Sequence, residues 1–579
     1  MSPRHQRGNN PHRSHILITR LLAKSQREGF LIPQMKRAIA RTLLLPLFFA
    51  TSAIGAPINA TGLKVDHQTN PVGVSNSPRL SWALESEGRS KRQLGCHILA
   101  ASSAENLAAG KGDLFDHKSE TDTNRNLRKW AGQPLKAGQE VHWKVRIFDE
   151  SKTWGDWSTP ARFTVAGLSP ASRLSGFESN HGPLNMLYQK SIAQLEQRLK
   201  KIAAGDQQGL GTPAEVQRSA REFYYNFDAT ASLLQYLKTL EEGRTAEGHY
   251  PSSPGKKDYN AIDANAGIIL PYALWWMTGD DEEAKKRWPI AERHLIAREK
   301  FDPNFTGKQW GTKISVIDGT PPEYLNICLM GMATRIMRQL ALPAGEPLNV
   351  IRYKDYAQRI RESFQNKYIA ENGSLKIKTQ TAHLLALRCA VLMPEQQQDI
   401  IDSLISSLKK DGIKVGPLGA EYLLPVLYLT GNQDLAFELV DKQMSGKVKE
   451  HFISNGLTDW MMSSLAGINS VQPGYRQLRL TPQIPSSNKI QWIKTHYDSS
   501  AGRIKIHWKK EDKGGLTFNC TVPPGVLAQL VLPATKGSVI TESGKTPKDA
   551  GGVEQVSRTD TVANYILQSG SYKFTVKQN

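Results

Sequence analysis

The spacing of apolar residues changes twice along this chain, and these changes constrain the fold more than any other feature. Between residues 183 and 467, apolar side chains recur every three or four positions in about eleven consecutive segments. That period is typical of amphipathic helices. Because the connections are short and no fixed repeat relates the segments, they predict an α/α toroid rather than a solenoid.

Strand-like alternation flanks the helical block on both sides. In the run from Val141 to Ile147 apolar and polar side chains alternate, and similar short runs separated by turn residues fill residues 60–167. This pattern is typical of a small antiparallel sandwich. The alternation returns from about residue 470 to the end. We therefore expect a helical barrel (175–468) between a fibronectin-III-like β-sandwich (60–167) and a C-terminal β-sandwich (470–579).

A leader precedes these domains, at residues 1–56. From Met35 the chain carries basic residues, then an apolar run of roughly ten residues, then small residues up to Ala56. This is the pattern of a secretory signal peptide and is too short to span a bilayer. We expect translation to start at Met35, although residues 1–34 also fit a disordered cytoplasmic extension. The pattern predicts export to the periplasm or the cell exterior, without stable membrane insertion.

The charge is strongly positive, with a formal net charge of +20 over 579 residues. The leader holds nine Lys or Arg and one Glu, so about +12 remains without it. This excess favours a negatively charged partner, such as an acidic polysaccharide or the cell envelope. Nucleic acid is the alternative for a basic chain, but we find no zinc-ligand spacing and no nucleic-acid-binding module. We expect no nucleic-acid partner.

Four cysteines lie far apart in the sequence, at Cys96, Cys328, Cys389 and Cys520. A disulfide between Cys328 and Cys389 and a set of buried free thiols are both consistent with this spacing. No cluster of His and Cys suggests zinc, so we predict neither a metal site nor a cofactor.

Several stretches, taken in order, resemble the bacterial α-L-rhamnosidase family. They are "LKVDHQTNPVGVSNSPRLSWALES", "VHWKVRIFDESKTWGDWSTPARF", "YNFD", "DANAGIILPYALW", "TQTAHLLAL", "LGAEYLLPVL" and "PGYRQLRLTPQI". The resemblance implies an inverting glycoside hydrolase with an (α/α)₆ barrel between β-domains, acting on terminal L-rhamnose of glycosides or polysaccharides. The expected partner is therefore a rhamnose-containing glycan. Some relatives bind calcium, but no motif here indicates a calcium site. The family usually has further β-domains before the barrel, so this is a shortened and divergent member.

The family's acid lies on a loop just before the helix that leads to "YNFD". An inverting glycosidase needs this acid to protonate the leaving oxygen, and a carboxylate about 6.5–9.5 Å away to activate water. An ungapped count back from Tyr225 places the loop on residues 202–215, with Ile202 at the acid's position. Asp206 remains a candidate acid if the loop moves by about one turn, and Glu215 and Asp263 are further candidates.

The family's base lies in a Trp-Glu-Arg-Trp segment after "LGAEYLLPVL", and this segment is missing here. Glu421 and Glu450 are the candidates for that role. The expected Gly-Asp-Trp before the next helix also reads Gly311-Thr312-Lys313. The loss of acids from three polar sites favours a barrel that folds but does not hydrolyse by the family mechanism. The alternatives to a hydrolase are thus a non-catalytic carbohydrate-binding protein and a truncated product without a role of its own.

Helix capping competes with catalysis as an explanation for two of these positions. "TPAE" from Thr212 to Glu215 has the Thr-x-x-Glu pattern of a capping box with Pro at the first helical position. "TPPE" from Thr320 to Glu323 repeats the pattern, and we expect a cap there too. Asp263 follows a turn, so it fits either a first-turn position or a residue near the sugar.

Five further residues are candidates for substrate binding: Asp228, His249, Asp258, Trp275 and Trp310. Asp228 in "YNFD" also fits a buried residue that holds two helices together. His249 and Asp258 flank a Pro-rich loop that is otherwise read as solvated. Adjacent residues of a helix face different ways, so at least one of Trp275 and Trp276 belongs to the core. Trp310 precedes Gly311 on a loop and would offer a platform for a sugar ring.

Overall fold

The computed structural model describes residues 58–74, 77–136, 138–165, 171–311, 318–444 and 456–578. The predicted signal segment, Thr312, Lys313 and Glu450 therefore lie outside the described residues. Within the part of the chain that the structure describes, no helix has the length and apolar character needed to cross a bilayer.

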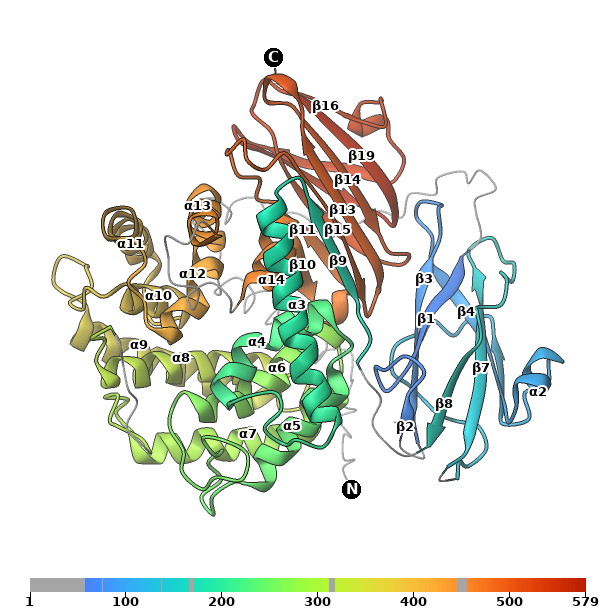
Figure 1. Cartoon of the computed structure of the whole chain (residues 1–579), viewed down its shortest axis with the longest axis horizontal. Coiled ribbons are helices and arrows are strands. Elements are labelled where there is room, and N and C mark those ends of the chain that lie inside the picture. Colours follow the sequence, from blue (N-terminus) through green and yellow to red (C-terminus); the bar gives the residue numbers. More distant parts are fainter. Residues whose placement is uncertain are drawn as a thin grey trace, which may run out of the picture. The chain divides into compact units, whose positions relative to one another are not determined.

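The first domain is a sandwich of two sheets, with strand orders β1-β3-β6 and β2-β8-β7-β4-β5 (Figure 1). Its elements are β1 (Asn59–Val65), β2 (Val72–Val74), β3 (Arg79–Glu85), β4 (Gln93–Ala101), α2 (Ala104–Ala108), β5 (Phe115–Ser119), β6 (Arg128–Lys129), β7 (Glu140–Asp149) and β8 (Ala161–Val165). The strands pair antiparallel except β2 and β8, which are parallel. The apolar side chains of β7 are the buried ones, as the alternation predicts.

Twelve helices follow among the described residues. They are α3 (Gly182–Ala203), α4 (Pro213–Asn226), α5 (Thr230–Glu242), α6 (Ala266–Thr278), α7 (Asp281–Phe301), α8 (Pro322–Leu340), α9 (Pro347–Tyr368), α10 (Gln380–Arg388), α11 (Gln397–Asp411), α12 (Pro417–Leu429), α13 (Gln433–Met444) and α14 (Leu457–Trp460). A π-helical turn, η5 (Met461–Leu465), continues α14.

These helices form a closed double ring. The inner helices α4, α6, α8, α10, α12 and α14 each pack against the next, and α14 packs back against α4. The remaining helices pack on the outside of this ring. Inner helices such as α6 are apolar on almost all sides, as expected for a helix surrounded by others. The predicted (α/α)₆ barrel is therefore confirmed.

One predicted helix is in fact two. The apolar spacing from Val216 to Leu237 predicts a single helix, but the chain breaks at residues 227–229 between α4 and α5. Phe227 is extended, and the amide of Asp228 donates to the carbonyl of Ser172 at 2.8 Å. Both helices keep the same apolar spacing across this short turn, so periodicity alone does not reveal it.

The ring closes through a buried polar contact between α4 and α14. Oε1 of Glu222 accepts hydrogen bonds from the amide and the hydroxyl of Thr458, at 3.1 and 3.0 Å. The Asn226 side chain donates to the same hydroxyl at 3.0 Å. Burial raises the pKa of Glu222 to about 7, although the hydrogen bonds from the start of α14 lower it.

The last domain is a second sandwich, with orders β10-β11-β15-β18-β17 and β16-β19-β14-β13-β12-β9. Its elements are β9 (Ser175–Ser179), β10 (Ile468–Gln472), η6 (Pro473–Tyr475), β11 (Gln477–Leu480), β12 (Trp492–Ser499), β13 (Gly502–Lys510), β14 (Leu516–Val522), β15 (Leu527–Pro533), β16 (Val539–Glu542), β17 (Val553–Arg558), β18 (Val562–Leu567) and β19 (Gly570–Lys577). Figure 1 shows β9, in blue-green, beside the orange strands of this sheet. The strand before the barrel thus belongs to the C-terminal sheet, which the sequence pattern did not predict.

A buried acid joins the first sandwich to the barrel. Asp280 is fully buried and caps α7 by accepting from the amide of Glu283 at 3.1 Å. His67 Nε2 lies 3.0 Å from its Oδ2, and Arg79 Nη1 donates to Oδ1 at 3.0 Å. Burial alone would raise the pKa of Asp280, but His67 and Arg79 outweigh it and hold the pKa well below its usual range.

The first prediction concerns Asp280. Because Asp280→Asn removes the buried anion of Arg79 and leaves it only the partly exposed Asp66, we expect a loss of about 2 kcal/mol in the free energy of unfolding. A depressed pKa gives stability that is present above the unfolded value near 3.9 and is lost as the pH falls below it. The difference from the wild type, measured by chemical denaturation, should therefore shrink below about pH 4. The control is Glu282→Gln, whose side chain is 64% exposed and should change stability by less than about 0.5 kcal/mol. Equal effects of both variants would contradict this role.

The second prediction concerns the ring closure. Glu222 has a raised pKa, so its contribution to stability is complete below the unfolded value near 4.3 and is lost as the pH rises through about 7. Glu222→Gln keeps a neutral acceptor for Thr458 and removes this titration. The wild type should thus lose stability relative to the variant between pH 5 and 8, as measured by denaturant unfolding at each pH. A constant difference over this range would contradict the buried titration.

Candidate active site

The barrel has two unlike ends. Long connections enter the inner helices, such as residues 243–262 before α6, whereas short turns such as 279–280 leave them. The long connections gather at the N-terminal ends of the inner helices, which we call the mouth. At the opposite end, Tyr225 donates to the carbonyl of Ile468 at 2.8 Å and Asn469 donates to Tyr428 at 3.0 Å, so β10 covers that end.

Mostly polar side chains line the interior of the ring, which we call the lumen. On inner helices that are otherwise buried, partly accessible residues recur at helical spacing, so they share one face. These are Arg218 and Arg221 on α4, Ile269, Tyr272 and Trp276 on α6, Arg335 on α8, Arg388 on α10, and Glu421, Pro425 and Tyr428 on α12. The charges of Arg335, Arg388 and Arg221 all act on Tyr272, so faces of four different helices meet inside the ring.

Glu421 is the candidate acid that lies in the lumen. Its Oε2 is buried and has no hydrogen-bond partner among the described residues. Burial raises the pKa of Glu421 to about 7, against the charges of Arg218 and Arg388 and a hydrogen bond from Tyr422, which lower it. Near neutral pH this carboxyl group is therefore partly protonated, which suits a proton donor.

Asp263 lies at the mouth, where it joins two inner helices. Its Oδ1 accepts from the amide of Ala214 in the first turn of α4 at 2.9 Å, and its Oδ2 accepts from Asn260 at 2.7 Å. Burial raises the pKa of Asp263; these hydrogen bonds and the charge of Arg218 lower it, and the exposed Asp258 raises it further. Arg218 thus interacts with both Asp263 and Glu421, and Asp258 lies on the mouth loop beside them.

Glu215 caps α4, as predicted. The amide of Glu215 donates to Thr212 Oγ1 at 3.3 Å, and Glu215 Oε2 accepts from the amide of Thr212 at 2.9 Å. Gly211 has a φ of +101°, and a Cβ there would lie 2.5 Å from this carboxylate, so the box requires glycine. The prediction of a second capping box, from Thr320 to Glu323, is wrong. Helix α8 begins at Pro322 without a side-chain cap, and Thr320 forms a hydrogen bond with Thr379 instead.

The predicted acid loop is shorter than the count implies. Ile202 is a buried residue inside α3, not a loop residue, so the ungapped register extends the loop into a helix. Asp206 is exposed and accepts from the amide of Gln208 at 2.9 Å, as in an Asx turn. Asp206 therefore faces solvent at the end of α3 and not the lumen.

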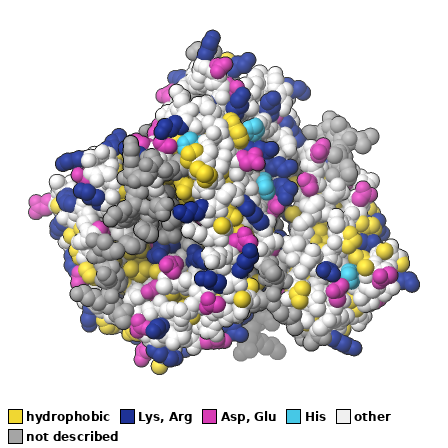
Figure 2. Space-filling model, in the orientation of Figure 1, with side chains coloured by type: hydrophobic (Ala, Val, Ile, Leu, Met, Phe, Trp, Pro, Cys, Tyr) yellow, Lys and Arg dark blue, Asp and Glu magenta, His cyan; other side chains and the backbone are white. Residues whose placement is uncertain are grey.

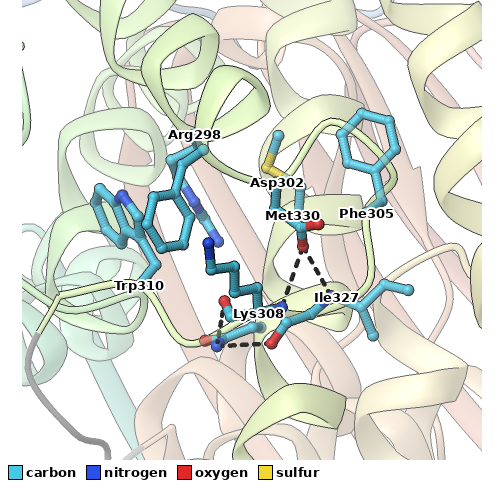
Figure 3. Close-up of a pocket in the computed structure, with 10 residues that line it drawn as sticks. Arg298, Asp302, Phe305, Lys308, Trp310, Ile327 and Met330 are labelled. Atoms are coloured by element: carbon cyan, nitrogen blue, oxygen red, sulfur yellow. Dashed lines mark hydrogen bonds between the residues drawn. The ribbon is translucent and has the colours of Figure 1, made fainter.

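His249 and Trp310 are buried together beneath the mouth loops. Their ring centroids are 4.6 Å apart, and Tyr259 and His294 complete an aromatic cluster. Arg298 lies 5.0 Å from the Trp310 ring. Figure 3 shows Trp310 beside Arg298 in a small pocket that extends to Asp302 and Phe305. With Trp310 only 3% exposed, the cluster supports the mouth and offers no open platform for a sugar.

Two candidates lie away from the mouth. Asp228 follows the C-terminal end of α4 and pairs with Lys64 of the first sandwich at 3.5 Å. Trp275 is buried near the end of α6, and its indole N–H donates to Asp281 at 2.7 Å. Of the two adjacent tryptophans, Trp275 is thus the core residue, and Trp276 faces the lumen. Asp228 and Trp275 therefore lie apart from the candidate acids Asp263 and Glu421.

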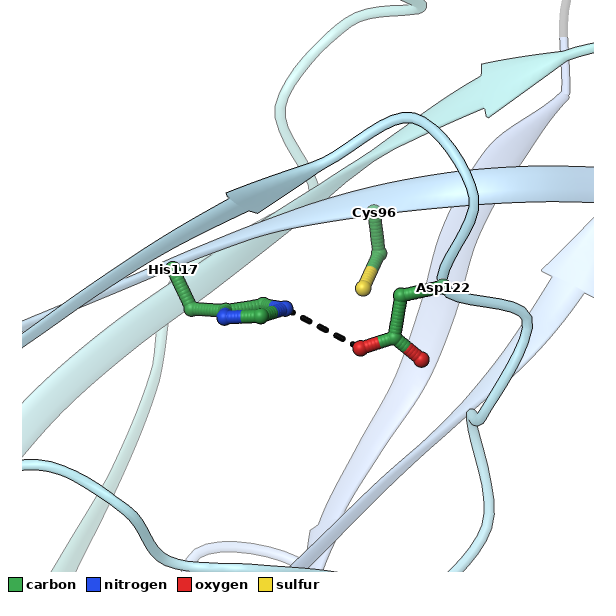
Figure 4. Close-up of side chains that lie close together, drawn as sticks. All are labelled: Cys96, His117 and Asp122. Atoms are coloured by element: carbon green, nitrogen blue, oxygen red, sulfur yellow. Dashed lines mark hydrogen bonds and ion pairs between the residues drawn. The ribbon is translucent and has the colours of Figure 1, made fainter.

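A group of potential metal ligands lies elsewhere, in the first sandwich. Cys96, His117 and Asp122 place one ligand atom each within 4.8 Å of one another (Figure 4). Arg128 donates to Asp122 and contacts His117 Nε2 at 3.1 Å. Since a guanidinium already binds two of the three groups, they do not fit a cation as arranged. All four cysteines are buried free thiols, so the disulfide between Cys328 and Cys389 is not formed.

Sequence reasoning missed the lumen arginines. Arg218 and Arg221 form a polar face on a predicted amphipathic helix, which normally indicates exposure to solvent. A helix of the inner ring turns its polar face into the lumen instead. The sequence held this signal, but assigning α4 to the inner ring requires the structure.

Three family models match the domains in order. Residues 172–458 match the six-hairpin glycosidase domain of bacterial α-L-rhamnosidases. Residues 60–169 match the N-terminal immunoglobulin domain of Rha78A-like proteins, and residues 467–547 match the C-terminal domain of bacterial α-L-rhamnosidases.

Individual relatives agree with this assignment. The α-L-rhamnosidase of Streptomyces avermitilis is 24% identical over 406 residues, which are 63% of this chain and 38% of that protein. That of Alteromonas sp. is 24% identical over 388 residues, or 58% of this chain and 42% of that protein. The chain thus spans well under half the length of these two relatives.

Solved structures share the fold. The Streptomyces avermitilis α-L-rhamnosidase, complexed with L-rhamnose, superposes with a TM-score of 0.75 at 13% identity, covering 90% of this chain and 100% of that one. The α-L-rhamnosidase from Dictyoglumus thermophilum gives 0.76 at 12% identity, covering 90% and 99%. Because the three family models match the two sandwiches and the barrel in order, the chain belongs to the bacterial α-L-rhamnosidase family.

Proposed function

We propose that this protein is an α-L-rhamnosidase-like glycoside hydrolase that takes terminal L-rhamnose of glycosides or polysaccharides into the lumen through the mouth. The observation that carries this proposal is Glu421, whose buried Oε2 has no partner among the described residues and whose pKa is raised to about 7. The Streptomyces avermitilis relative, solved with L-rhamnose, supports the choice of sugar. The signal segment at Met35 supports export, so the glycan would be met outside the cytoplasm.

Glu421 has the properties of a general acid. Such an acid must be protonated when it meets the substrate and must then carry a negative charge after donating its proton. Burial favours the protonated form before the reaction, while Arg218 and Arg388 stabilise the carboxylate that the reaction leaves. The surroundings of Glu421 thus favour its protonated form before the reaction and its carboxylate form after it.

The water-activating carboxylate is Asp263 or Glu450. Asp263 shares Arg218 with Glu421 and accepts two hydrogen bonds, which lower its pKa against the raising effect of burial. Those two hydrogen bonds also hold the side chain of Asp263 towards α4, which limits how far its carboxylate can extend into the lumen. Glu450 lies outside the described residues and keeps its place as the second candidate from the sequence.

The second candidate function is a non-catalytic carbohydrate-binding protein of the same fold. The specific observation in its favour is that both acids at the mouth cap α4: Glu215 through its capping box and Asp263 through Ala214. Both acids at the mouth thus have structural partners, whereas Oε2 of Glu421 has none among the described residues.

The third prediction separates these functions. We expect Glu421→Gln to lower kcat by about 10²–10⁴-fold on a rhamnoside with a poor leaving group, such as a rhamnosyl disaccharide. The loss should be smaller on 4-nitrophenyl α-L-rhamnoside, whose leaving group needs less protonation. In the wild type, turnover should decline above about pH 7, because the acid must be protonated.

The control for this experiment is Glu196→Gln, a residue of α3 whose side chain is 45% exposed and pairs with Lys200. It should leave turnover unchanged. Full activity of Glu421→Gln would overturn the assignment of the acid. Saturable binding of L-rhamnose without turnover by the wild type would instead support the non-catalytic protein.

A further inference from the structure

Two histidines lie buried together in the aromatic cluster beneath the mouth. His249 is almost fully buried, and His294 of α7 is completely so. Their ring centroids are 5.9 Å apart, and Trp310 lies 4.6 Å from His249 and 5.4 Å from His294. The ring of Tyr250 lies 5.3 Å from His294. Both imidazoles are therefore surrounded by other rings and not by water.

These imidazoles lack hydrogen bonds that a buried ring normally makes. Both ring nitrogens of His294 and Nδ1 of His249 are buried and have no hydrogen-bond partner among the described residues. The hydroxyl of Tyr250 and the indole N–H of Trp310 are also buried without a partner there. A protonated imidazole carries two N–H donors and a positive charge. A neutral ring therefore suits these surroundings better than a charged one.

A third basic group adds to the cost of protonation. Arg298 follows His294 by one turn of α7, and its guanidinium carbon lies 5.0 Å from the centre of the Trp310 ring. Its Nη1 donates to the neutral Asn265 at 2.9 Å. Burial lowers the pKa of Arg298 to about 10, so this group stays charged at neutral pH. Protonation of either histidine would therefore place a second positive charge near Arg298.

The surroundings hold both histidines neutral near pH 7. Burial lowers the pKa of His294 well below its usual range, and the charges of Arg298 and His249 lower it further. Burial also lowers the pKa of His249, and Arg298 acts in the same direction. Glu247, on the exposed part of the mouth loop, opposes these effects on His249.

Other charged groups surround the cluster at its edges. Asp302 raises the pKa of Arg298, and its carboxylate accepts hydrogen bonds from the backbone and a hydroxyl group of residues 306–308. The remaining groups act on Tyr250 or pack beside Gly248; they are Glu241, Arg244, Arg287 and Arg293. Within the described part of the chain, the cluster itself thus contains basic and neutral groups but no acid.

The cluster joins two loops of the mouth to α7. One is the connection 243–262, which supplies His249, and the other is the segment 302–311, which supplies Trp310. His294 contacts both rings from the outer helix. Loss of these contacts would release both loops from α7.

The same loops reach a candidate acid at the mouth. Asn260 and Gly311 form a β-bridge between the two loops. The side chain of Asn260 donates to Asp263 Oδ2 at 2.7 Å. The contacts of the cluster and the position of Asp263 are therefore linked through Asn260.

Histidines at the surface have different surroundings. Figure 2 shows such side chains, in cyan, among basic and acidic groups. His142 pairs with Glu140 at 2.8 Å, and 19% of its side chain is accessible. A positive charge on such a ring is solvated or paired, so protonation disturbs its contacts little.

We propose that the aromatic cluster is a pH-sensitive latch, which holds the two mouth loops against α7 near neutral pH and releases them in acid, when His294 and His249 take up protons. Release exposes the imidazoles to water, where each can carry its charge. Histidines whose pKa is lowered in the closed state stabilise closure above about pH 6.5, and this stability is lost as the pH falls below that value. The inference goes beyond the proposed function and does not depend on turnover.

The fourth prediction tests the latch by hydrogen–deuterium exchange between pH 7.5 and 5.0, with rates corrected for the intrinsic pH dependence of exchange. In the wild type we expect peptides from residues 244–262 and 302–311 to lose protection by about tenfold or more over this range. Peptides from α8 should keep their protection, because the inner ring stays closed.

The matched variants are His294→Phe in the cluster and His142→Gln in the first sandwich. His294→Phe keeps an aromatic ring and removes one titration, so it should reduce the acid loss of loop protection to about threefold or less. His142→Gln should behave as the wild type does. If His294→Phe does not fold, His249→Phe removes the other titration and should also reduce the loss.

Protection of both loops that does not change with pH in the wild type would overturn the inference, as would an unchanged acid loss in the folded cluster variant. Loss of protection in α8 together with the loops would indicate general acid unfolding and would overturn it as well. Exchange is measured without substrate. Its outcome is therefore distinct from a failure of the proposed function, which turnover by Glu421→Gln tests.

Discussion

Closure of the inner helices into a ring is the constraint on which the rest of the structure depends. A ring of six helices must turn one face of each helix inwards, and that face cannot be covered by the outer helices. Here the last contact of the ring is polar and buried, with Glu222 of α4 accepting two hydrogen bonds from Thr458 at the start of α14. The ring both creates the lumen and sets the environment of every group in it.

The mouth shows how structural and chemical roles compete for the same acids. The first turn of a helix has unpaired amides, and carboxylates are the strongest acceptors for them. Glu215 and Asp263 both serve α4 in this way, so their charge is used in joining helices. Glu421 is one turn inside α12, where amides are already paired within the helix. Its carboxyl group is therefore free of capping, and its pKa responds mainly to burial.

Periodicity predicted the fold almost completely, because an α/α barrel is built from amphipathic helices of similar length. It failed at residues 227–229, where a short turn keeps the apolar spacing, and at β9, whose partner β12 lies far along the chain. Local patterns were less reliable for the site. "TPAE" forms the predicted cap, but "TPPE" does not, because the hydroxyl of Thr320 forms a hydrogen bond with the hydroxyl of Thr379 from another helix instead. Trp275 and Trp276 could be recognised as a core residue and a lumen residue, but only the ring decides which is which.

The same limit explains why the sequence did not identify the arginines of the lumen. A polar helix face indicates exposure, and the sequence cannot tell exposure to bulk water from exposure to an enclosed space. The two differ in energy: on the outer surface a guanidinium is solvated and its charge is screened, whereas in the lumen Arg388 faces two other arginines. A barrel retained only as a scaffold would be more stable with apolar residues at these positions. The position of a helix in the ring therefore decides what its polar face indicates, and that position cannot be read from the sequence of the helix alone.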